Sequence, residues 1–327
     1  MKQKAEFKFK VGIVGCGNMA KVHVRLLSRF INKDDIAVFD KDEMRLKNFT
    51  KSMGLLHAYH DFDKLLALFR PDVIHIVTPP ATHKDIALKC LESKIHVLIE
   101  KPLCVLSEEA DAILAASRKY ERMVCVDHMR SFDPMIKKVK GMLDSGNYGD
   151  ITHVSIGYSY DYLKRVGSDA SARWINDLPG GCFFDLLPHL LCLLDDFLPD
   201  LRIKSTYIKK DAYDVVTDLA CSFTSAKGLA DLHMSLNIFP LKNYIEFECT
   251  KGIIRVDLRN FLIIVRKCYG LPNAVERIAQ NISVGSQILF GSLNSILQFF
   301  LGNLDSYAGL GIIIKEYYEA IEQHKES

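Results

Sequence analysis

Short apolar runs alternate with segments of helical spacing over roughly the first 128 residues. The runs end in glycine or proline, as "FKVGIVG" and "DVIHIVTPP" do, and their length is typical of buried strands. Strands and helices that alternate in this way predict right-handed βαβ crossovers and a parallel sheet. The predicted strands are 9–15, 35–40, 72–80, 95–102 and 123–128, and the predicted helices are 18–30, 62–69, 83–94 and 107–120.

Beyond about residue 130 the pattern changes to strands that follow one another without intervening helices. They are rich in β-branched and aromatic residues, and "TSAKG" and "TKG" are typical of hairpin connections. We therefore expect an open, mostly antiparallel sheet, with a helix around 185–189 and a helical tail over 274–323. These predicted strands are 151–162, 201–210, 215–223, 229–237, 244–250 and 253–258.

The expected fold class is α/β, in two domains. Residues 1–128 would form a doubly wound parallel sheet of the Rossmann type, which binds dinucleotides. Residues 129–327 would form an α+β domain for substrate binding and oligomerisation.

Composition excludes several classes of protein. The 327 residues are 49% apolar and 25% charged with a formal net charge of +2, so no nucleic-acid partner is expected. Nine scattered cysteines have no zinc-ligand spacing, which predicts no structural metal and a reducing, cytoplasmic location. The basic N-terminus resembles a solvated lead-in rather than a signal peptide.

No apolar run is long enough for a membrane span. Residues 284–302 come closest, but Ser, Asn and Gln interrupt them. A membrane-surface helix is not favoured either, because the stretch contains no Lys or Arg. The stretch fits a core helix or the interface of a homo-oligomer, a dimer or a tetramer.

The stretch "VGIVGCGNMA" places glycines between a strand and a helix. Gly15 permits a tight turn, Gly17 lets the backbone approach a pyrophosphate, and Ala20 allows close helix–strand packing. Asp40 ends the next strand, where a carboxylate can bond the ribose hydroxyls. This favours NAD over NADP, although Lys41 weakens the preference.

Two further segments end strands at the edge where open α/β sheets bind ligands. Lys101 follows a buried strand and precedes a proline, so we expect it to reach the nicotinamide end of the cofactor. His83 fits a role in the site and an ordinary helix-start position equally well. His23, His57, His60, His96 and His153 receive no functional role.

The motifs "VGIVGCGNMAKVH", "HVLIEKPL", "VDHMRSFDP" and "GGCFFDLLPH", in this order, resemble the Gfo/Idh/MocA family of NAD(P)-dependent oxidoreductases. The resemblance implies a Rossmann domain, an open-sheet domain, and hydride transfer on a carbon of a sugar, cyclitol or sugar-nucleotide. The family's catalytic Lys falls on Lys101, and its Asp and His fall on Asp185 and His189. Leu187 and Ser131 depart from the family pattern. The tail 307–321 is similar to members near polysaccharide and sugar-nucleotide pathways.

The pair Asp185 and His189 stands in a strongly apolar run. Residues four apart share a helix face, so both can point into a substrate cleft. Because proline is tolerated only in the first turn, Pro188 predicts a helix that starts near Asp185, whose dipole opposes protonation of His189. In the alternative interpretation, the pair is a buried structural contact that satisfies itself.

The expected site combines both domains. We expect His189 to take the hydroxyl proton, Lys101 to stabilise the alkoxide, and Asp185 to orient His189 or a substrate hydroxyl. Trp174 could stack on a sugar ring, although packing is the favoured interpretation of an isolated aromatic. Expected cofactor-binding residues are Gly15, Cys16, Gly17, Asn18, Met19, Asp40, Thr78, Pro79, His83, Glu100 and Lys101, and expected substrate-binding residues are Lys101, His128, Trp174, Asp185 and His189.

Two other functions remain open. One is a regulatory protein that binds a dinucleotide without turnover, and an intact Lys101, Asp185 and His189 set argues against it. The other is a reductase of a non-sugar substrate, such as a tetrapyrrole or an imine, which can dispense with the Asp–His pair.

Overall fold

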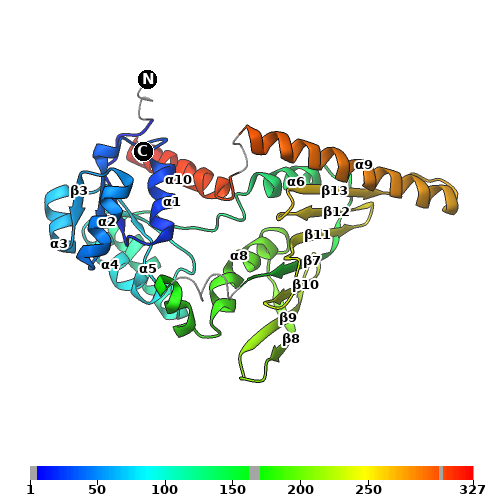
Figure 1. Ribbon diagram of the computed structural model, residues 1–327, viewed down its shortest axis with the longest axis horizontal. Helices are drawn as coiled ribbons and strands as arrows, with labels where there is room; N and C mark the ends of the chain where they lie inside the picture. Colours follow the sequence, from blue (N-terminus) through cyan, green and yellow to red (C-terminus); the bar gives the residue numbers. More distant parts are fainter. Residues whose placement is uncertain (1–5, 162–169, 302–304, 327) are drawn as a thin grey trace. The chain divides into compact units, whose positions relative to one another are not determined.

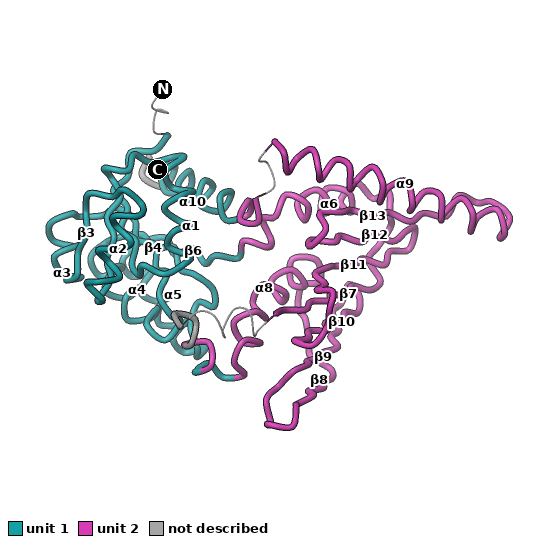
Figure 2. Tube along the Cα trace, in the orientation of Figure 1, with its two compact units in different colours: residues 1–128, 177–179, 310–327 teal, residues 129–176, 180–309 magenta. Residues whose placement is uncertain are grey.

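A computed structural model describes residues 6–161, 170–301 and 305–326, and these form two compact units (Figures 1 and 2). The first unit contains residues 1–128, 177–179 and 310–327, and the second contains 129–176 and 180–309. The tail 310–327, which the sequence placed in the second domain, groups with the first unit. The division into the domains 1–128 and 129–327 stays a prediction. Parts of the predicted lead-in 1–10, strand 151–162 and tail 274–323 lie outside the described residues.

The first unit is built on a six-stranded sheet with the order β3-β2-β1-β4-β5-β6. All neighbouring strands are parallel, which confirms the prediction. The order reverses between β1 and β4, and open α/β sheets bind ligands at such a point. The strands are β1 (Val11–Val14), β2 (Ile36–Phe39), β3 (His57–Tyr59), β4 (Val73–Ile76), β5 (His96–Ile99) and β6 (Val124–Val126).

Helices connect these strands, as the sequence predicted. The predicted helix 62–69 forms only one α-helical turn and a π-helical turn, while α2 and β3 were not predicted. The helices are α1 (Asn18–Leu27), α2 (Glu43–Met53), α3 (Phe62–Lys64), α4 (His83–Glu92) and α5 (Ser107–Tyr120), with shorter turns η1 (Lys33–Asp35), η2 (Leu65–Phe69) and η3 (Pro80–Thr82).

The C-terminal helix α10 (Ala308–Glu326) packs on the first unit's sheet. Its Tyr317 hydroxyl lies 2.9 Å from the Val97 carbonyl oxygen and 3.0 Å from that of Met123, to which it donates. Tyr318, fully buried, packs against the rings of Phe7 and Phe9. A segment about 190 residues distant in sequence therefore completes the core of the first unit.

The second unit is built on a seven-stranded sheet with the order β13-β12-β11-β7-β10-β9-β8. Only β10 and β7 pair in parallel, so the expectation of a mostly antiparallel sheet is confirmed. The strands are β7 (Ile151–Ser159), β8 (Arg202–Lys210), β9 (Val216–Ser225), β10 (Gly228–Ser235), β11 (Asn243–Cys249), β12 (Gly252–Asp257) and β13 (Leu262–Lys267), and the other elements are α6 (Pro134–Asp144), η4 (Ala170–Asp177), α8 (Cys182–Phe197) and α9 (Asn273–Phe300).

Helix α8 supplies much of the second unit's core, because it buries Leu186, Leu190 and Leu194 against the sheet. It begins at Cys182, after Gly180 and Gly181, which adopt positive φ angles of 79° and 59°. The predicted start near Asp185 is therefore wrong. Pro188 lies inside the helix and forgoes one backbone hydrogen bond, which the packing of the apolar face offsets.

Among the described residues, no helix has the length and apolar character that crossing a membrane requires.

Candidate functional site

The turn after β1 requires glycine at its first position. Gly15 has a φ of +103°, and a Cβ there would lie 2.9 Å from the Val77 carbonyl oxygen. A Cβ on Gly17 would meet nothing within 4 Å. Gly15 therefore shapes the loop, whereas Gly17 leaves open space over it, as the approach of a pyrophosphate demands.

Helix α1 starts directly after this turn. Gly17 is the N-cap of this helix, and no side chain forms a capping hydrogen bond with its first N–H groups. Ala20 is fully buried, which allows close packing on the sheet. Asn18 is exposed, and Met19 is half-buried. An uncapped N-terminus at a glycine turn suits the phosphates of a dinucleotide.

Asp40 follows β2 and holds the same turn. Its Oδ2 accepts a hydrogen bond from the Cys16 amide at 2.9 Å, and its Oδ1 accepts one from Asp42 at 2.9 Å. Burial and the Asp40 charge raise the pKa of the Cys16 thiol to about 12, so Cys16 stays neutral. The carboxylate is thus oriented beside the loop.

Arg45 on α2 is a residue that the sequence reasoning missed. Its guanidinium lies 3.6 Å from Asp40 Oδ2, and its side chain is 51% exposed. An arginine on the first turn of the helix that follows Asp40 was the available signal. Lys41, the cation that the sequence singled out, is exposed.

His83 at the start of α4 joins two loops at the carboxyl ends of β4 and β5. Its Nε2 lies 2.8 Å from the Thr78 carbonyl oxygen, and its Nδ1 lies 3.1 Å from that of Pro102. Burial lowers the pKa of His83, while these backbone carbonyls raise it. Both ring nitrogens face backbone carbonyls, so His83 braces the loops. Thr78 is half-buried and Pro79 exposed.

Glu100 and Lys101 stand at the end of β5. Glu100 is 6% exposed, and its Oε1 lies 3.0 Å from His23 Nε2. The side chain of Glu100 therefore engages a buried cluster, whereas half-buried Lys101 belongs to the rim of the same strand end. His23, which the sequence reasoning left without a role, is a central member of this cluster.

Asp185 and His189 lie in the second unit on α8. Asp185 is 2% exposed and His189 is half-buried. The spacing of four residues places them on one face of the helix. His189 is eight residues into α8, so the predicted effect of the helix dipole on it is wrong, because that effect falls off within the first turn.

The two remaining expected substrate contacts have different surroundings. Trp174 packs partly buried against the core of the second unit, as the packing interpretation predicted. His128 is half-buried next to fully buried Asp127.

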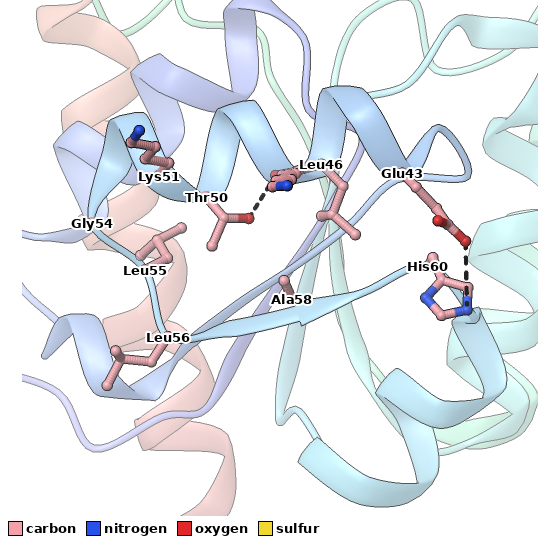
Figure 3. A pocket seen from close by; sticks show the side chains of 10 residues that line it. Glu43, Leu46, Thr50, Lys51, Gly54, Leu55, Leu56, Ala58 and His60 are labelled. Atoms are coloured by element: carbon pink, nitrogen blue, oxygen red, sulfur yellow. Dashed lines mark hydrogen bonds and ion pairs between the residues drawn. The ribbon is translucent and has the colours of Figure 1, made fainter.

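A shallow surface groove runs along α2 and β3 (Figure 3). Glu43 and His60 face each other at one end, with 4.0 Å between His60 Nε2 and Glu43 Oε1. The groove shares no residue with the glycine turn, Asp40 or Lys101. Its lining of exposed apolar and charged side chains holds no buried reactive group, so we assign it no catalytic role.

A parallel sheet with a glycine turn and an oriented acid defines a dinucleotide-binding protein of the Rossmann class. Residues 9–128 match the model of an oxidoreductase family with an NAD-binding Rossmann fold, and residues 136–255 match the GFO/IDH/MocA C-terminal domain. The chain belongs to the Gfo/Idh/MocA oxidoreductase family, as the motifs indicated.

Relatives with curated names include the uncharacterized oxidoreductase YrbE of Bacillus subtilis (strain 168), 33% identical over 54% of this chain and 50% of the relative. The myo-inositol 2-dehydrogenase of Thermotoga maritima is 26% identical over 55% of this chain and 52% of the relative. The chain thus spans about half the length of these two relatives.

The fold is similar to that of the WlbA dehydrogenase from Chromobacterium violaceum, solved in complex with NADH and UDP-GlcNAcA. The TM-score is 0.70 at 20% identity, and the match covers 97% of this chain and 94% of the other.

The two glycines should respond differently to alanine. Gly15→Ala adds a Cβ against Val77 at positive φ, and should destabilise the fold by about 1–3 kcal/mol. Gly17→Ala should leave the unfolding midpoint in urea near wild type but weaken NAD binding at least about tenfold, because its methyl group projects into open space. Calorimetric titration with NAD measures the second effect. Unchanged affinity in a folded Gly17→Ala variant would show that the cofactor lies elsewhere.

Proposed function

We propose that this protein is an NAD(P)-dependent oxidoreductase that transfers a hydride between nicotinamide and a secondary alcohol or ketone carbon of a sugar, cyclitol or sugar-nucleotide. The uncapped glycine turn with Asp40 fixed beside it carries the proposal. Membership of an NAD-binding oxidoreductase family supports it, as do relatives named for inositol and for a UDP-sugar complex.

The residues present fit a dinucleotide. Open space over Gly17 accommodates the pyrophosphate, and the first N–H groups of α1 donate hydrogen bonds to its oxygens. The Asp40 carboxylate accepts hydrogen bonds from the ribose hydroxyls. When bound, the nicotinamide supplies the C4 position that accepts or returns the hydride.

We assign three side chains to the reaction. In the oxidative direction His189 takes the substrate hydroxyl proton as the carbinol hydrogen leaves as hydride. Lys101 donates a hydrogen bond to the same oxygen and stabilises its developing negative charge. Asp185, fixed one turn before His189 on α8, orients the imidazole or a neighbouring hydroxyl. The mechanism requires Lys101 of the first unit and the pair of the second to meet at one carbon.

We further propose NAD rather than NADP as the preferred cofactor. Asp40 presents a buried carboxylate where a 2′-phosphate would stand, and bringing two anions together is unfavourable. Arg45 partly offsets that charge, but more than half of its side chain is exposed, so solvent weakens its effect.

Substitution at both positions tests the preference. Wild type should bind NAD at least about tenfold more tightly than NADP. Asp40→Ala should reduce that ratio by weakening NAD and relieving repulsion of the 2′-phosphate, while Arg45→Ala should weaken NADP alone. Calorimetric titrations with NAD and NADP give the ratio for each of the three proteins. Tighter binding of NADP to wild type would mean that Arg45 or Lys41 outweighs Asp40.

Turnover can be measured with NAD and two probe substrates, myo-inositol and UDP-GlcNAcA. Lys101→Ala and His189→Ala should each lower kcat by roughly two or more orders of magnitude. His189→Ala should leave NAD affinity nearly unchanged, because the residue acts on the substrate. As a control, Leu68→Glu on the exposed η2 turn should keep wild-type kcat.

The class of reaction is overturned if no sugar, polyol or sugar-nucleotide probe reduces NAD. If both variants keep wild-type kcat, the assignment of these residues is wrong.

We propose that the protein forms a homo-oligomer through α9. The helix turns polar side chains to the edge strand β13: Gln287 accepts from the Val265 amide at 2.8 Å and donates to its carbonyl at 2.9 Å. Its only charged residues are Glu276 and Arg277, and its apolar side chains are exposed. The exposed apolar residues on α9 are Val275, Ile278, Ile282, Ile288, Leu289, Phe290, Leu293, Ile296, Leu297, Phe299 and Phe300. An apolar surface of this extent marks an interaction site in a folded protein.

Light scattering tests this proposal. Wild type should have a mass of at least twice that of one chain, which is 37.0 kDa. Leu289→Glu combined with Leu293→Glu should shift it to the single-chain mass, because buried charges disrupt an apolar interface. Leu68→Glu, equally exposed but on the first unit, should not. A wild-type protein with the mass of one chain contradicts the proposal.

The nine cysteines all lie in the described part of the chain, and none of them forms a disulfide. We propose that the protein works in a reducing compartment, the cytoplasm, where thiols persist.

A further inference from the structure

Buried polar side chains form a continuous chain in the first unit, from α10 to the end of β5. The Tyr318 hydroxyl lies 2.9 Å from His75 Nε2, and His75 Nδ1 lies 2.8 Å from His23 Nδ1. His23 Nε2 in turn lies 3.0 Å from Glu100 Oε1. Asp127, after β6, adjoins Glu100 and is fully buried. None of these residues belongs to the reaction as described above.

The hydrogen bonds of this chain have one consistent direction. The ring of Tyr318 packs against the rings of Phe7 and Phe9, and among the described residues the hydrogen-bond partner of its hydroxyl is His75. If the hydroxyl accepted from His75, its own proton would be buried without an acceptor, which is costly. Tyr318 therefore donates to His75 Nε2.

That direction determines the tautomers of both histidines. Because His75 Nε2 accepts, its Nδ1 carries the proton and donates to His23 Nδ1. His23 then carries its proton on Nε2 and donates it to Glu100. Each ring is neutral and uses both nitrogens, so Glu100 is the acceptor at the end of the chain.

These hydrogen bonds do not include Asp127, and its protonation state has to be argued separately. Neither of its carboxyl oxygens receives an N–H or O–H from the part of the chain that the structure describes. Its neighbour is a second carboxyl group, that of Glu100. Two adjacent buried carboxylates cannot both stay charged without a cation or a proton between them.

A metal ion is the first way to neutralise the pair. Ligand atoms of His23, Glu100 and Asp127 lie within 4.8 Å of one another. A metal would need the Nε2 lone pair of His23, but that nitrogen carries the proton donated to Glu100. Metal binding would reverse the whole chain and leave the Tyr318 proton without an acceptor. A proton on Asp127 satisfies every group without that cost.

The charges around Asp127 agree with this assignment. Burial raises the pKa of Asp127 well above its usual range, and the Glu100 charge raises it further, against smaller opposite effects of His23 and Lys101. Burial lowers the pKa of His23 to about 4 and also lowers that of His75. Nearby Cys125 is neutral, because its pKa is raised to about 12, chiefly by burial.

We propose that Asp127 is a positioning residue whose side chain is kept protonated and donates to Glu100, and that the chain from Tyr318 through His75 and His23 holds Glu100 as the acceptor. An uncharged Asp127 does not compete with the reacting oxygen for the Lys101 ammonium, which is close enough to act on Asp127 electrostatically. The part that concerns Lys101 rests on the proposed function, whereas the protonation state does not.

Infrared difference spectroscopy tests the protonation state without any substrate. Wild type at neutral pH should show the carbonyl band of a protonated carboxylic acid, and Asp127→Asn should remove it. Absence of the band in wild type overturns the proposal. So does a stoichiometric divalent cation found by elemental analysis of the purified protein and lost in Asp127→Asn.

The neighbouring tyrosines provide a matched pair for the direction of the chain. Tyr318→Phe removes the first donor and should shift the carboxylic acid band. Tyr317→Phe removes an equally buried hydroxyl that serves backbone carbonyls instead, and should leave the band in place. A band that responds equally to both variants contradicts the oriented chain.

Stability against pH gives an independent readout. A carboxyl group with a raised native pKa binds more protons in the folded state, so its contribution to stability falls as pH rises above the unfolded value near 3.8. The urea midpoint of Asp127→Asn relative to wild type should therefore increase from pH 4 upward. A flat difference contradicts a protonated Asp127.

Turnover with NAD and the probe substrates tests the link to Lys101. Asp127→Asn mimics the neutral acid and should keep kcat within a few-fold of wild type, whereas Asp127→Ala, which cannot donate to Glu100, should lower it by about tenfold or more. Loss of kcat in both variants contradicts the positioning role. If the band is present but Lys101→Ala keeps full turnover, the role assigned to Lys101 is wrong while the protonation state stands. If the band is present but no probe substrate reduces NAD, the proposed function fails and the protonation state still stands.

Discussion

The carboxyl edge of the parallel sheet gathers buried acidic side chains, and the first unit depends on how each of them is compensated. Parallel strands end at one edge, so Asp40 after β2, Glu100 after β5 and Asp127 after β6 all arrive there. A buried charge is costly unless hydrogen bonds or partners compensate it. Asp40 meets backbone amides, and Glu100 meets a histidine. Each of these acids is therefore compensated in a different way.

Asp40 connects stability with recognition. The oxygen that accepts from the Cys16 amide belongs to the carboxylate that we expect to bind the ribose. The acid therefore fixes the shape of the glycine turn before a cofactor arrives, which reduces the ordering that binding requires. His83 does the same for the loops after β4 and β5. In the first unit, side chains that bond to backbone groups thus hold the loops at the carboxyl edge of the sheet in place.

Local signals allowed the sequence to predict the glycine turn, Asp40 and both sheets, because each depends on residues close together in the chain. The buried chain was not predictable in this way, since Tyr318 and His75 are 243 residues apart. The start of α8 was missed because Gly180 and Gly181 set the helix entry, and its apolar face keeps Pro188 inside the helix. Helix α2 and strands β3 and β13 were not predicted. The roles of Lys101, Asp185 and His189 remain a prediction.

The buried chain and the surface of α9 both follow from the need of buried polar groups for hydrogen-bond partners, but with opposite results. On α9 the polar side chains are used to satisfy the backbone of the edge strand β13, so the apolar ones remain outside. In the buried chain that ends at Glu100 the polar side chains bond to one another, and aromatic rings pack against Tyr318 at its other end. The proposed proton on Asp127 would leave Glu100 and Lys101 as the two opposite charges at one strand end. In the mechanism that we propose, Lys101 would then act on the substrate oxygen without being drawn to a second carboxylate.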